Sequence, residues 1–443
     1  MPRVIVIGAG LAGSLLAIYL AKRDFEVDVY EARRDMRHEE VAAGRSINLA
    51  LSDRGIAALR EIGMDEYMLA EAVPMYGRMV HGIDGDTKLL PYSGREGEYI
   101  NSVSRAGLNI ALINEAEKYD GVNFHFDRRC LGFDFGTGEV QFDDGRTVAG
   151  DTLIATDGAG SAVRESIAEQ LGSFELSQSF LEHGYKELHI PAGPDGSFSL
   201  YKNALHIWPR HQFMMIALPN FDGSFTCTLF LANEGPGAAF DQLVDESALS
   251  ELFTREFPDA VPLMPTLVED FFHNPTGLLG TIKCWPWSVD DKVLLLGDSA
   301  HAMVPFYGQG MNCAFEDVRV LDSLIGKHGA DWATIYAEYG NLRKINTDAI
   351  CDMAQENFYE MRDATADPVF QRKRQLETRL EQAYPDYFSK YSMVTFREDL
   401  PYSVAKTRGN AQDAALMSIC RDVADVNGLD LDAVMRRVRE LET

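Results

Sequence analysis

Hydrophobic runs that end in glycine or aspartate open the chain and recur twice further along it. Residues 4–7 (VIVI) form a continuous apolar run, residues 11–22 have the apolar content of a helix, and residues 27–30 (VDVY) predict the next strand. The runs at 152–155 (TLIA) and 293–296 (VLLL) have the same character. Strands of this kind are buried on both faces of a parallel sheet. The pattern predicts an α/β fold built on a doubly wound sheet.

The middle of the chain has a different pattern, in which apolar and β-branched residues alternate with polar ones. It appears in the runs at 185–190, 205–208, 214–218 and 224–230, and the turn-forming residues PNFDG at 219–223 connect two of these runs. Such alternation is typical of strands with one buried face. We therefore expect an antiparallel sheet inserted into the doubly wound domain.

From residue 331 onward the hydrophobic spacing is helical, with interruptions near Pro385 and Pro401. These changes of pattern predict four segments. They are 1–176 and 283–330 for the two parts of the doubly wound domain, 177–282 for the inserted sheet, and 331–443 for a C-terminal helical region that covers the pocket.

Composition narrows the classes of protein to consider. Of the 443 residues 46% are hydrophobic and 25% are charged, which is typical of a globular protein. The net charge of −27 argues against nucleic acid or an anionic membrane as a partner, because both require a basic surface. Residues 3–7 already have the pattern of a strand and no apolar run reaches about 20 residues, so we expect no secretory leader and a cytoplasmic protein. Six scattered cysteines predict reduced thiols, without a disulfide framework or a zinc site.

Residues 8–13 (GAGLAG) match the G-x-G-x-x-G pattern between a strand and a helix. Gly8 allows the tight turn, Gly10 lets the backbone approach a pyrophosphate, and Gly13 lets helix and strand pack closely. Glu31 closes the second strand, where a carboxylate can accept hydrogen bonds from ribose hydroxyls. The candidate dinucleotide-binding residues of this unit are Gly8, Gly10, Leu11, Ala12, Gly13, Glu31, Ala32 and Arg33.

Two further blocks follow strands later in the chain. Residues 155–164 (ATDGAGSAVR) contain Asp157, and residues 296–301 (LGDSAH) contain Asp298, which is placed to bind ribityl hydroxyls of a flavin. The sequence PFYGQGMN at 305–312 then leads into a predicted helix that extends through residue 324. The N–H groups at its start can face the edge of a flavin ring and stabilise negative charge there. Its candidate cofactor residues are Gly310, Met311 and Asn312.

These three blocks, in this order, resemble the group A flavoprotein aromatic hydroxylases. The resemblance implies a Rossmann-like FAD-binding domain of the p-hydroxybenzoate hydroxylase type, with tightly bound FAD. It places Arg45 beside the flavin and Arg105 near the ribityl chain and phosphates, and it adds Ala50 and Cys130 to the cofactor contacts. Because the chain has a single G-x-G-x-x-G motif, we expect NADPH to dock transiently as a co-substrate.

A narrower resemblance, to the kynurenine 3-monooxygenase family, extends over nearly the whole chain. Its blocks include GRSINLAL at 44–51, GRMVH at 77–81, HGYKEL at 183–188, NFYEM at 357–361 and YSMVTF at 391–396. The resemblance implies that Arg78, Tyr92, Asn357 and Tyr391 hold the amino-acid end of L-kynurenine, with a guanidinium that binds the carboxylate through two hydrogen bonds. It places Phe306, Tyr307, Glu360 and Met361 in the pocket near the flavin. Tyr307 departs from the family, in which His or Phe stands at this position.

The resemblance also implies the reaction. NADPH reduces FAD, O2 forms a C4a-hydroperoxide on the flavin, and one oxygen atom is transferred to the ring carbon beside the aniline nitrogen, which gives 3-hydroxy-L-kynurenine. The aniline already activates the ring, so we assign no catalytic base. Such a reaction belongs to tryptophan catabolism and NAD biosynthesis, and we expect a monomer or a homodimer.

Three alternatives stay open. The first is a hydroxylase of a substituted kynurenine or another ortho-amino aryl acid. The second is a flavin halogenase, whose W-x-W-x-I-P motif is matched by Trp285 and Trp287 but not by Val289 and Asp290. The third is a non-catalytic protein that has lost its flavin, which would purify without colour.

Overall fold

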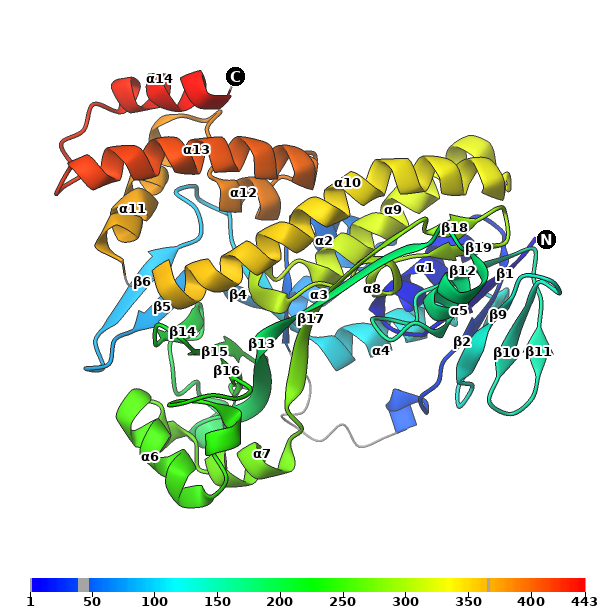
Figure 1. Ribbon diagram of the computed structural model, residues 1–443, viewed down its shortest axis with the longest axis horizontal. Helices are drawn as coiled ribbons and strands as arrows, with labels where there is room; N and C mark the ends of the chain where they lie inside the picture. The colour runs from blue at the N-terminus through cyan, green and yellow to red at the C-terminus, as the bar shows by residue number, and fades with distance from the viewer. Residues whose placement is uncertain (1, 39–47, 365–366, 443) are drawn as a thin grey trace.

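The computed structural model describes residues 2–38, 48–364 and 367–442 (Figure 1). A six-stranded sheet at one end has the order β18-β19-β12-β1-β2-β8, in which β18 alone runs antiparallel to its neighbour. The predicted doubly wound sheet is therefore confirmed. Its strands are β1 (Arg3–Ile7), β2 (Glu26–Tyr30), β8 (Val122–His125), β12 (Thr152–Ala155), β18 (Ser288–Val289) and β19 (Val293–Leu295).

Helix α1 (Leu11–Ala21) lies at the centre of this domain. Nearly all of its side chains are apolar and residues 13–20 are buried, as expected of a helix covered on all sides. It contacts β1 and β2 on the sheet, and α4 (Arg105–Ala116) and α9 (Gly310–His328) beside it. This packing fixes the glycine turn between β1 and α1 against the carboxyl ends of the neighbouring strands.

Two small sheets flank the domain. One consists of β9 (Cys130–Asp134), β10 (Glu139–Phe142) and β11 (Thr147–Val148), and it contacts α5 (Ala162–Gln170). The other consists of β3 (Asn48–Leu51), β7 (Ile100–Ser104) and β4 (Val73–Met75). Short helices complete this half, namely α2 (Asp53–Glu61), α3 (Asp65–Ala70) and α8 (Asp298–His301), with 3-10 turns at Met36–His38 and Pro305–Tyr307.

A seven-stranded sheet of order β17-β13-β16-β15-β14-β5-β6 forms the second layer. The predicted strands of the middle region are present as β13 (Glu175–Ile190), β14 (Leu205–Pro209), β15 (Met214–Pro219) and β16 (Phe225–Ala232), joined by β17 (Gly277–Trp285). The sequence did not predict that β5 (Gly77–His81) and β6 (Thr87–Pro91) extend this sheet, nor that β5 runs parallel to β14. Pairing between strands so distant in sequence leaves no local pattern.

The two faces of this sheet are covered differently. One face packs against α6 (Glu246–Glu256) and α7 (Leu267–His273) in a core that contains Trp208 and Phe253. The other face carries Ile207 and Phe230, which pack against Phe358 of the C-terminal helices. Further 3-10 turns lie at Pro194–Gly196, Phe240–Gln242 and Val261–Leu263.

The helical C-terminal region consists of α10 (Trp332–Tyr359), a π-helical turn (Glu360–Ala364), α11 (Pro368–Ala383), α12 (Lys390–Thr395), α13 (Tyr402–Asp422) and α14 (Leu431–Glu442). The predicted interruptions near Pro385 and Pro401 are confirmed. Helix α10 runs alongside β17 from one half of the molecule to the other (Figure 1), so α11 and α12 lie near β5 and β6.

No helix in the described ranges is long and apolar enough to cross a membrane. All six cysteines are free thiols, and five of them are buried.

Candidate functional site

The glycine turn between β1 and α1 borders open space. Gly8 has a φ of +100°, and a Cβ there would lie 2.5 Å from the Thr156 carbonyl oxygen, while a Cβ on Gly13 would lie 1.9 Å from the Gly8 carbonyl oxygen. A Cβ on Gly10 would meet no described atom within 4 Å. Gly8 and Gly13 thus serve close packing, and the space beside Gly10 allows a phosphate to approach the backbone at the helix start. Leu11 and Ala12 are half-buried beside it.

Glu31 lies at the carboxyl end of β2 and faces this turn. It accepts hydrogen bonds from the Ala9 amide (2.9 Å), the Arg33 amide (2.9 Å) and Arg33 Nε (2.8 Å). Burial favours a higher pKa for Glu31, but the hydrogen bonds from Arg33 and Ala9 outweigh it and hold the pKa below its ordinary value. An ionised carboxylate is therefore fixed at the edge of the sheet, with Ala32 half-buried and Arg33 exposed beside it.

Asp157 follows β12 and has an unsatisfied oxygen. Its Oδ2 accepts a long hydrogen bond from the Val163 amide (3.4 Å), whereas its buried Oδ1 has no partner among the described residues. Burial raises the pKa of Asp157, and burial together with the Asp157 charge raises the pKa of the Cys130 thiol to about 12. A buried acceptor without a partner is costly in a native fold. This oxygen therefore suits a hydroxyl of a bound ligand.

Asp298 follows β19 at a turn where Gly297 has a φ of +66°. Its side chain borders solvent, yet desolvation by the surrounding protein raises its pKa, partly offset by His301 and Arg105. Solvent contact combined with strong desolvation is the environment of a deep cleft. Arg105, at the exposed start of α4, shares this cleft. Arg45 lies outside the described residues.

The start of α9 closes the cleft. A Cβ on Gly310 would have open space, with Met303 Cγ nearest at 4.0 Å, and the first N–H groups of a helix lack partners within the helix. The Asn312 side chain is occupied, because it donates to the carbonyls of Ala50 (2.8 Å) and Gly308 (2.9 Å) and accepts from the Ser52 amide (3.0 Å). The Asn312 side chain and Ala50 thus shape the loop, and backbone N–H groups are left to face a ligand. Met311 is buried behind them.

We call this arrangement the dinucleotide cradle. It comprises the turn at 8–13, Glu31, Asp157, Asp298 and the start of α9. It offers open space at a helix start, a carboxylate at a ribose position and the carboxylates of Asp157 and Asp298 as acceptors for hydroxyls, and these features fit FAD.

A second site, the Arg78 pocket, lies between the seven-stranded sheet and the C-terminal helices. Arg78 extends from β5 with its guanidinium carbon 5.9 Å from the Tyr92 ring centre and 5.4 Å from that of Tyr391. Among the described residues neither Nε of Arg78 nor the buried Tyr92 hydroxyl has a hydrogen-bond partner. Burial raises the pKa values of Tyr92 and Tyr391, which keeps both phenols protonated as hydrogen-bond donors.

Three tyrosines stack to form one wall of this pocket. The Tyr92 and Tyr391 rings are 5.1 Å apart at 11°, and the Tyr391 and Tyr307 rings are 5.7 Å apart at 18°. Tyr307 belongs to the 3-10 turn just before α9, so the wall extends from Arg78 toward the dinucleotide cradle. Burial, with the nearby charge of Glu360, raises the pKa of Tyr307.

The structure separates the predicted pocket residues into two layers. Arg78, Tyr307, Asn357, Glu360 and Tyr391 line the cavity itself, and Tyr92 backs Tyr391. Asn357 donates from Nδ2 to the Phe306 carbonyl (2.6 Å). The remaining two residues lie behind the cavity surface, because Phe306 packs between Phe230 and Phe358 and Met361 is buried.

Charged residues of the C-terminal helices also line the pocket, and the sequence did not predict them. Lys373 contacts Asp413 (2.5 Å) and Glu377 (3.3 Å), and Arg374 contacts Glu377 (2.8 Å). Burial favours a lower pKa for Lys373, but Glu377 and Asp413 raise it. The alternating charges at 371–381 resemble a solvated helix face, and only their i, i+3 and i, i+4 spacing hinted at pairing. The other lining residues are Met353, Glu356 and Lys390.

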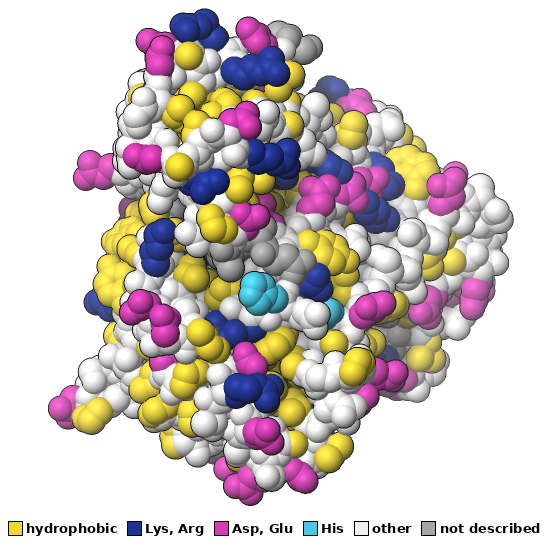
Figure 2. Space-filling view, turned by 60° about the vertical axis from the view of Figure 1, so that its left-hand side comes forward, with side chains coloured by type: hydrophobic (Ala, Val, Ile, Leu, Met, Phe, Trp, Pro, Cys, Tyr) yellow, Lys and Arg dark blue, Asp and Glu magenta, His cyan; other side chains and the backbone are white. Residues whose placement is uncertain are grey.

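Arg78 differs from the other cations of this pocket. Lys373, Arg374 and Lys390 each have a carboxylate partner within 4 Å, whereas Arg78 has none in the part of the chain that the structure describes. On the face shown in Figure 2, Lys and Arg are interspersed with Asp and Glu. Arg78 is thus a cation in the pocket without a carboxylate of its own, and it is suited to a single carboxylate of a ligand.

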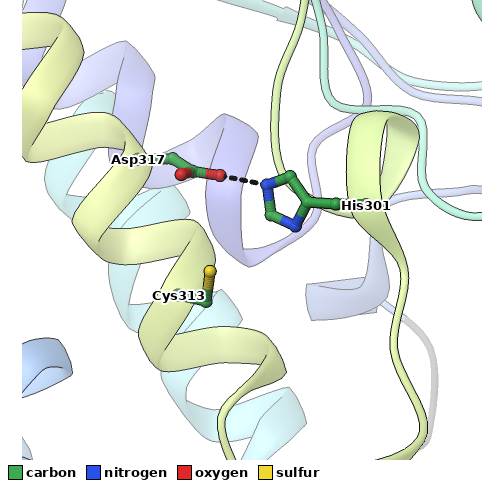
Figure 3. Close-up of side chains that lie close together, drawn as sticks. All are labelled: His301, Cys313 and Asp317. Carbon is green, nitrogen blue, oxygen red and sulfur yellow. Dashed lines mark hydrogen bonds and ion pairs between the residues drawn. The ribbon is translucent and has the colours of Figure 1, made fainter. Parts of the chain in front are cut away.

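His301, Cys313 and Asp317 also lie close together (Figure 3), with potential metal-binding atoms within 4.8 Å of one another. Asp317 is already engaged, because it contacts His301 Nε2 (2.6 Å) and Arg343 Nε (2.6 Å). The Arg343 guanidinium thus supplies the positive charge that a metal ion would bring. We assign this cluster to the framework of the fold.

Comparison with known proteins places the chain among flavoproteins. A family model described as "FAD binding domain" matches residues 1–201 and 283–336. The chain is 46% identical over 442 residues to a protein of Myxococcus xanthus named kynurenine 3-monooxygenase, an alignment that covers 98% of this chain and 94% of the relative. A protein of the same name from Dictyostelium discoideum is 43% identical, with 98% and 96% covered.

Solved structures show the same fold at low identity. The tetrameric form of 2-methyl-3-hydroxypyridine-5-carboxylic acid oxygenase matches with a TM-score of 0.67 at 19% identity, over 85% of this chain and 97% of that one. HpxO of Klebsiella pneumoniae, solved with FAD, matches with a TM-score of 0.68 at 23% identity, over 85% and 95%.

Proposed function

The chain belongs to the kynurenine 3-monooxygenase family of FAD-dependent monooxygenases, and on that premise we propose that it hydroxylates L-kynurenine to 3-hydroxy-L-kynurenine with NADPH and O2. The observation that carries the proposal is Arg78. It is a guanidinium with no carboxylate partner among the described residues, and it lies beside two stacked tyrosine rings in a pocket that adjoins the dinucleotide cradle.

The dinucleotide cradle would hold FAD. Bound FAD supplies the redox chemistry, because it accepts a hydride from NADPH and activates O2. In the proposed arrangement the glycine turn at 8–13 faces the pyrophosphate, Glu31 accepts from the ribose, and Asp298 accepts from the ribityl chain. The N–H groups at the start of α9 face the ring edge that becomes negative on reduction.

The Arg78 pocket would hold the amino-acid end of the substrate. The Arg78 guanidinium pairs with the α-carboxylate, and the protonated Tyr391 hydroxyl donates to the same group. Because Asn357 Nδ2 is already bonded to the Phe306 carbonyl, Asn357 Oδ1 is left as an acceptor for the α-ammonium. Tyr92, buried behind Tyr391, offers a second hydroxyl to the carboxylate.

The substrate ring would then extend past Tyr307 toward the cradle. The aniline nitrogen activates the neighbouring ring carbon, so the protein does not need to deprotonate the substrate. The work of the side chains is to orient this carbon and to exclude water, which otherwise diverts activated oxygen to hydrogen peroxide. We also propose that the protein is cytoplasmic and that it is a monomer or a homodimer. Light scattering of the purified protein tests the oligomeric state.

The deciding experiment is aerobic NADPH consumption by the yellow protein with and without L-kynurenine, with mass analysis of the product. Strong stimulation and a product one oxygen atom heavier would support the proposal. Stimulation that yields only hydrogen peroxide would instead favour a substituted kynurenine or another ortho-amino aryl acid. No stimulation would refute the assignment of L-kynurenine.

A further inference from the structure

A continuous network of buried ionisable side chains connects the two halves of the molecule. It runs from Arg54 Nη1 to Glu316 Oε1 (2.5 Å), from Glu316 Oε2 to Arg343 Nη1 (2.6 Å), from Arg343 Nε to Asp317 Oδ1 (2.6 Å), and from Asp317 Oδ2 to His301 Nε2 (2.6 Å). Four of the five side chains are at most 4% exposed, and Glu316 is 13% exposed. Solvent and salt therefore screen these contacts weakly.

At one end, this network of side chains holds the turn that presents Asp298. Asp317 Oδ2 accepts from the Gly297 amide (3.2 Å) as well as contacting His301 (Figure 3). These two partners stand on either side of Asp298 in the short helix α8. Because the Asp317 carboxylate binds both Gly297 and His301, it fixes the position of Asp298 between them.

At the other end, the network holds the segment that follows Tyr391. Arg54 donates from Nε to the Val394 carbonyl (3.1 Å) and from Nη2 to the carbonyls of Arg397 (3.0 Å) and Leu400. Val394 belongs to α12, the same six-residue helix as Tyr391. Arg54 thereby fixes the helix that brings Tyr391 into the Arg78 pocket.

We propose that Glu316 is a positioning residue, which bridges Arg54 and Arg343 and so sets the position of Tyr391 relative to Asp298. Its two carboxylate oxygens each bind a different guanidinium, and a neutral side chain of the same shape cannot neutralise both. In the proposed hydroxylation, on which this inference rests for its catalytic consequence, a displaced Tyr391 would hold the substrate out of line with the flavin. NADPH oxidation would then yield hydrogen peroxide at the expense of hydroxylated product.

The test compares Glu316→Gln with the control Glu338→Gln, both as FAD-loaded proteins. Glu338 also joins α10 to α9, through Lys327 (3.0 Å) and His328 (3.1 Å), but this contact lies at the surface. The first measurement is hydrogen–deuterium exchange of peptides covering 296–302 and 394–402, which requires no turnover. The second is the fraction of NADPH oxidised to hydrogen peroxide with L-kynurenine present.

In Glu316→Gln we expect hydrogen–deuterium exchange about fivefold faster in both peptides and a peroxide fraction at least doubled. The FAD content should be unchanged. Glu338→Gln should behave like the wild type in every measurement. Faster exchange in one peptide only, or in neither, would overturn the proposal. If Glu316→Gln does not fold, Arg54→Lys, which keeps the charge but loses the fork, is judged by the same two readouts. Failure of wild-type protein to hydroxylate kynurenine would refute the proposed function, while the exchange result would still decide the role of Glu316.

Discussion

The dinucleotide cradle and the Arg78 pocket are built in different ways. The cradle uses backbone turns and short side chains that follow β1, β2, β12 and β19, all at the same edge of one sheet. The pocket uses long side chains from β5, the 3-10 turn before α9, and α10 to α13. Substitutions in the cradle should therefore change cofactor content, whereas substitutions in the pocket should change the KM for substrate with the cofactor retained.

The largest effect is expected at the glycine turn. In Gly13→Ala the new Cβ would lie 1.9 Å from the Gly8 carbonyl oxygen, so β1 and α1 must separate and we expect nearly complete loss of FAD and a lower Tm. Gly10→Ala is the matched control, because its Cβ meets no described atom within 4 Å. The Tm of its apoprotein should stay unchanged, while the Kd for FAD rises about tenfold, equivalent to ~1.4 kcal/mol.

Flavin absorbance of the purified proteins and thermal melts of their apo forms provide the readouts. A Gly13→Ala protein that retains wild-type FAD content would show that the turn is more adaptable than its packing indicates. An unchanged FAD affinity in Gly10→Ala would place the phosphates elsewhere.

The next largest effect is expected at Arg78. Removing one partner of a buried charge pair costs ~2–5 kcal/mol, so Arg78→Ala should lower kcat/KM for L-kynurenine about 30-fold to several thousand-fold, mainly through KM. The FAD content should not change, because no hydrogen bond or ion pair joins Arg78 to a described residue of the cradle. Steady-state kinetics and the visible spectrum measure the two separately. A colourless Arg78→Ala protein would break the distinction between cradle and pocket.

A smaller effect on stability is expected at Asp53, the first residue of α2. Burial, with Glu398 and Glu98 nearby, raises the pKa of Asp53 in the folded protein to about 6, from an ordinary value of 3.8. A carboxyl group with a raised folded pKa destabilises the fold when it is ionised, so stability is lost as pH rises between these two values. Asp53→Asn should raise the Tm at pH 7.5 by about 2 °C or more and have no such effect near pH 4. Equal gains at both pH values would show that Asp53 does not titrate in this range.

The sequence predicted the placement of the cradle residues in the fold far better than that of the pocket residues. The glycine turn, Glu31, Asp157 and Asp298 each follow a buried strand, and strand ends in one parallel sheet meet at the same edge by geometry. The sequence did not predict which of these side chains face a ligand and which hold the surrounding loops in place. The Asn312 side chain binds the loop carbonyls of Ala50 and Gly308, and this contact depends on how β3 packs against α9.

The pocket depended on tertiary packing that local patterns do not record. Arg78, Asn357 and Tyr391 were predicted through a family resemblance, since Tyr alone is commonly a half-buried packing residue. The charged face of α11 with Lys373 and Glu377 has the composition of a solvated helix, yet both side chains are buried. No periodicity distinguishes a charged face that meets water from one that meets another charged face.

The smallest effect is expected at Tyr307, where pocket and cradle meet. Tyr307→Phe keeps the ring stacked on Tyr391, and the lost hydroxyl has no hydrogen bond among the described residues. A single neutral hydrogen bond contributes ~0.5–1.5 kcal/mol. If the Tyr307 hydroxyl binds the substrate, its loss should raise the KM at most about tenfold. If it does not, we expect the KM to rise less than about threefold. Tyr391→Phe is the matched variant, because it removes a donor to the carboxylate, worth ~1.5–3 kcal/mol, and should raise the KM at least about tenfold. If Tyr307→Phe raises the KM as much as Tyr391→Phe does, the hydroxyl peculiar to this chain binds the substrate, and the Arg78 pocket extends to the flavin itself.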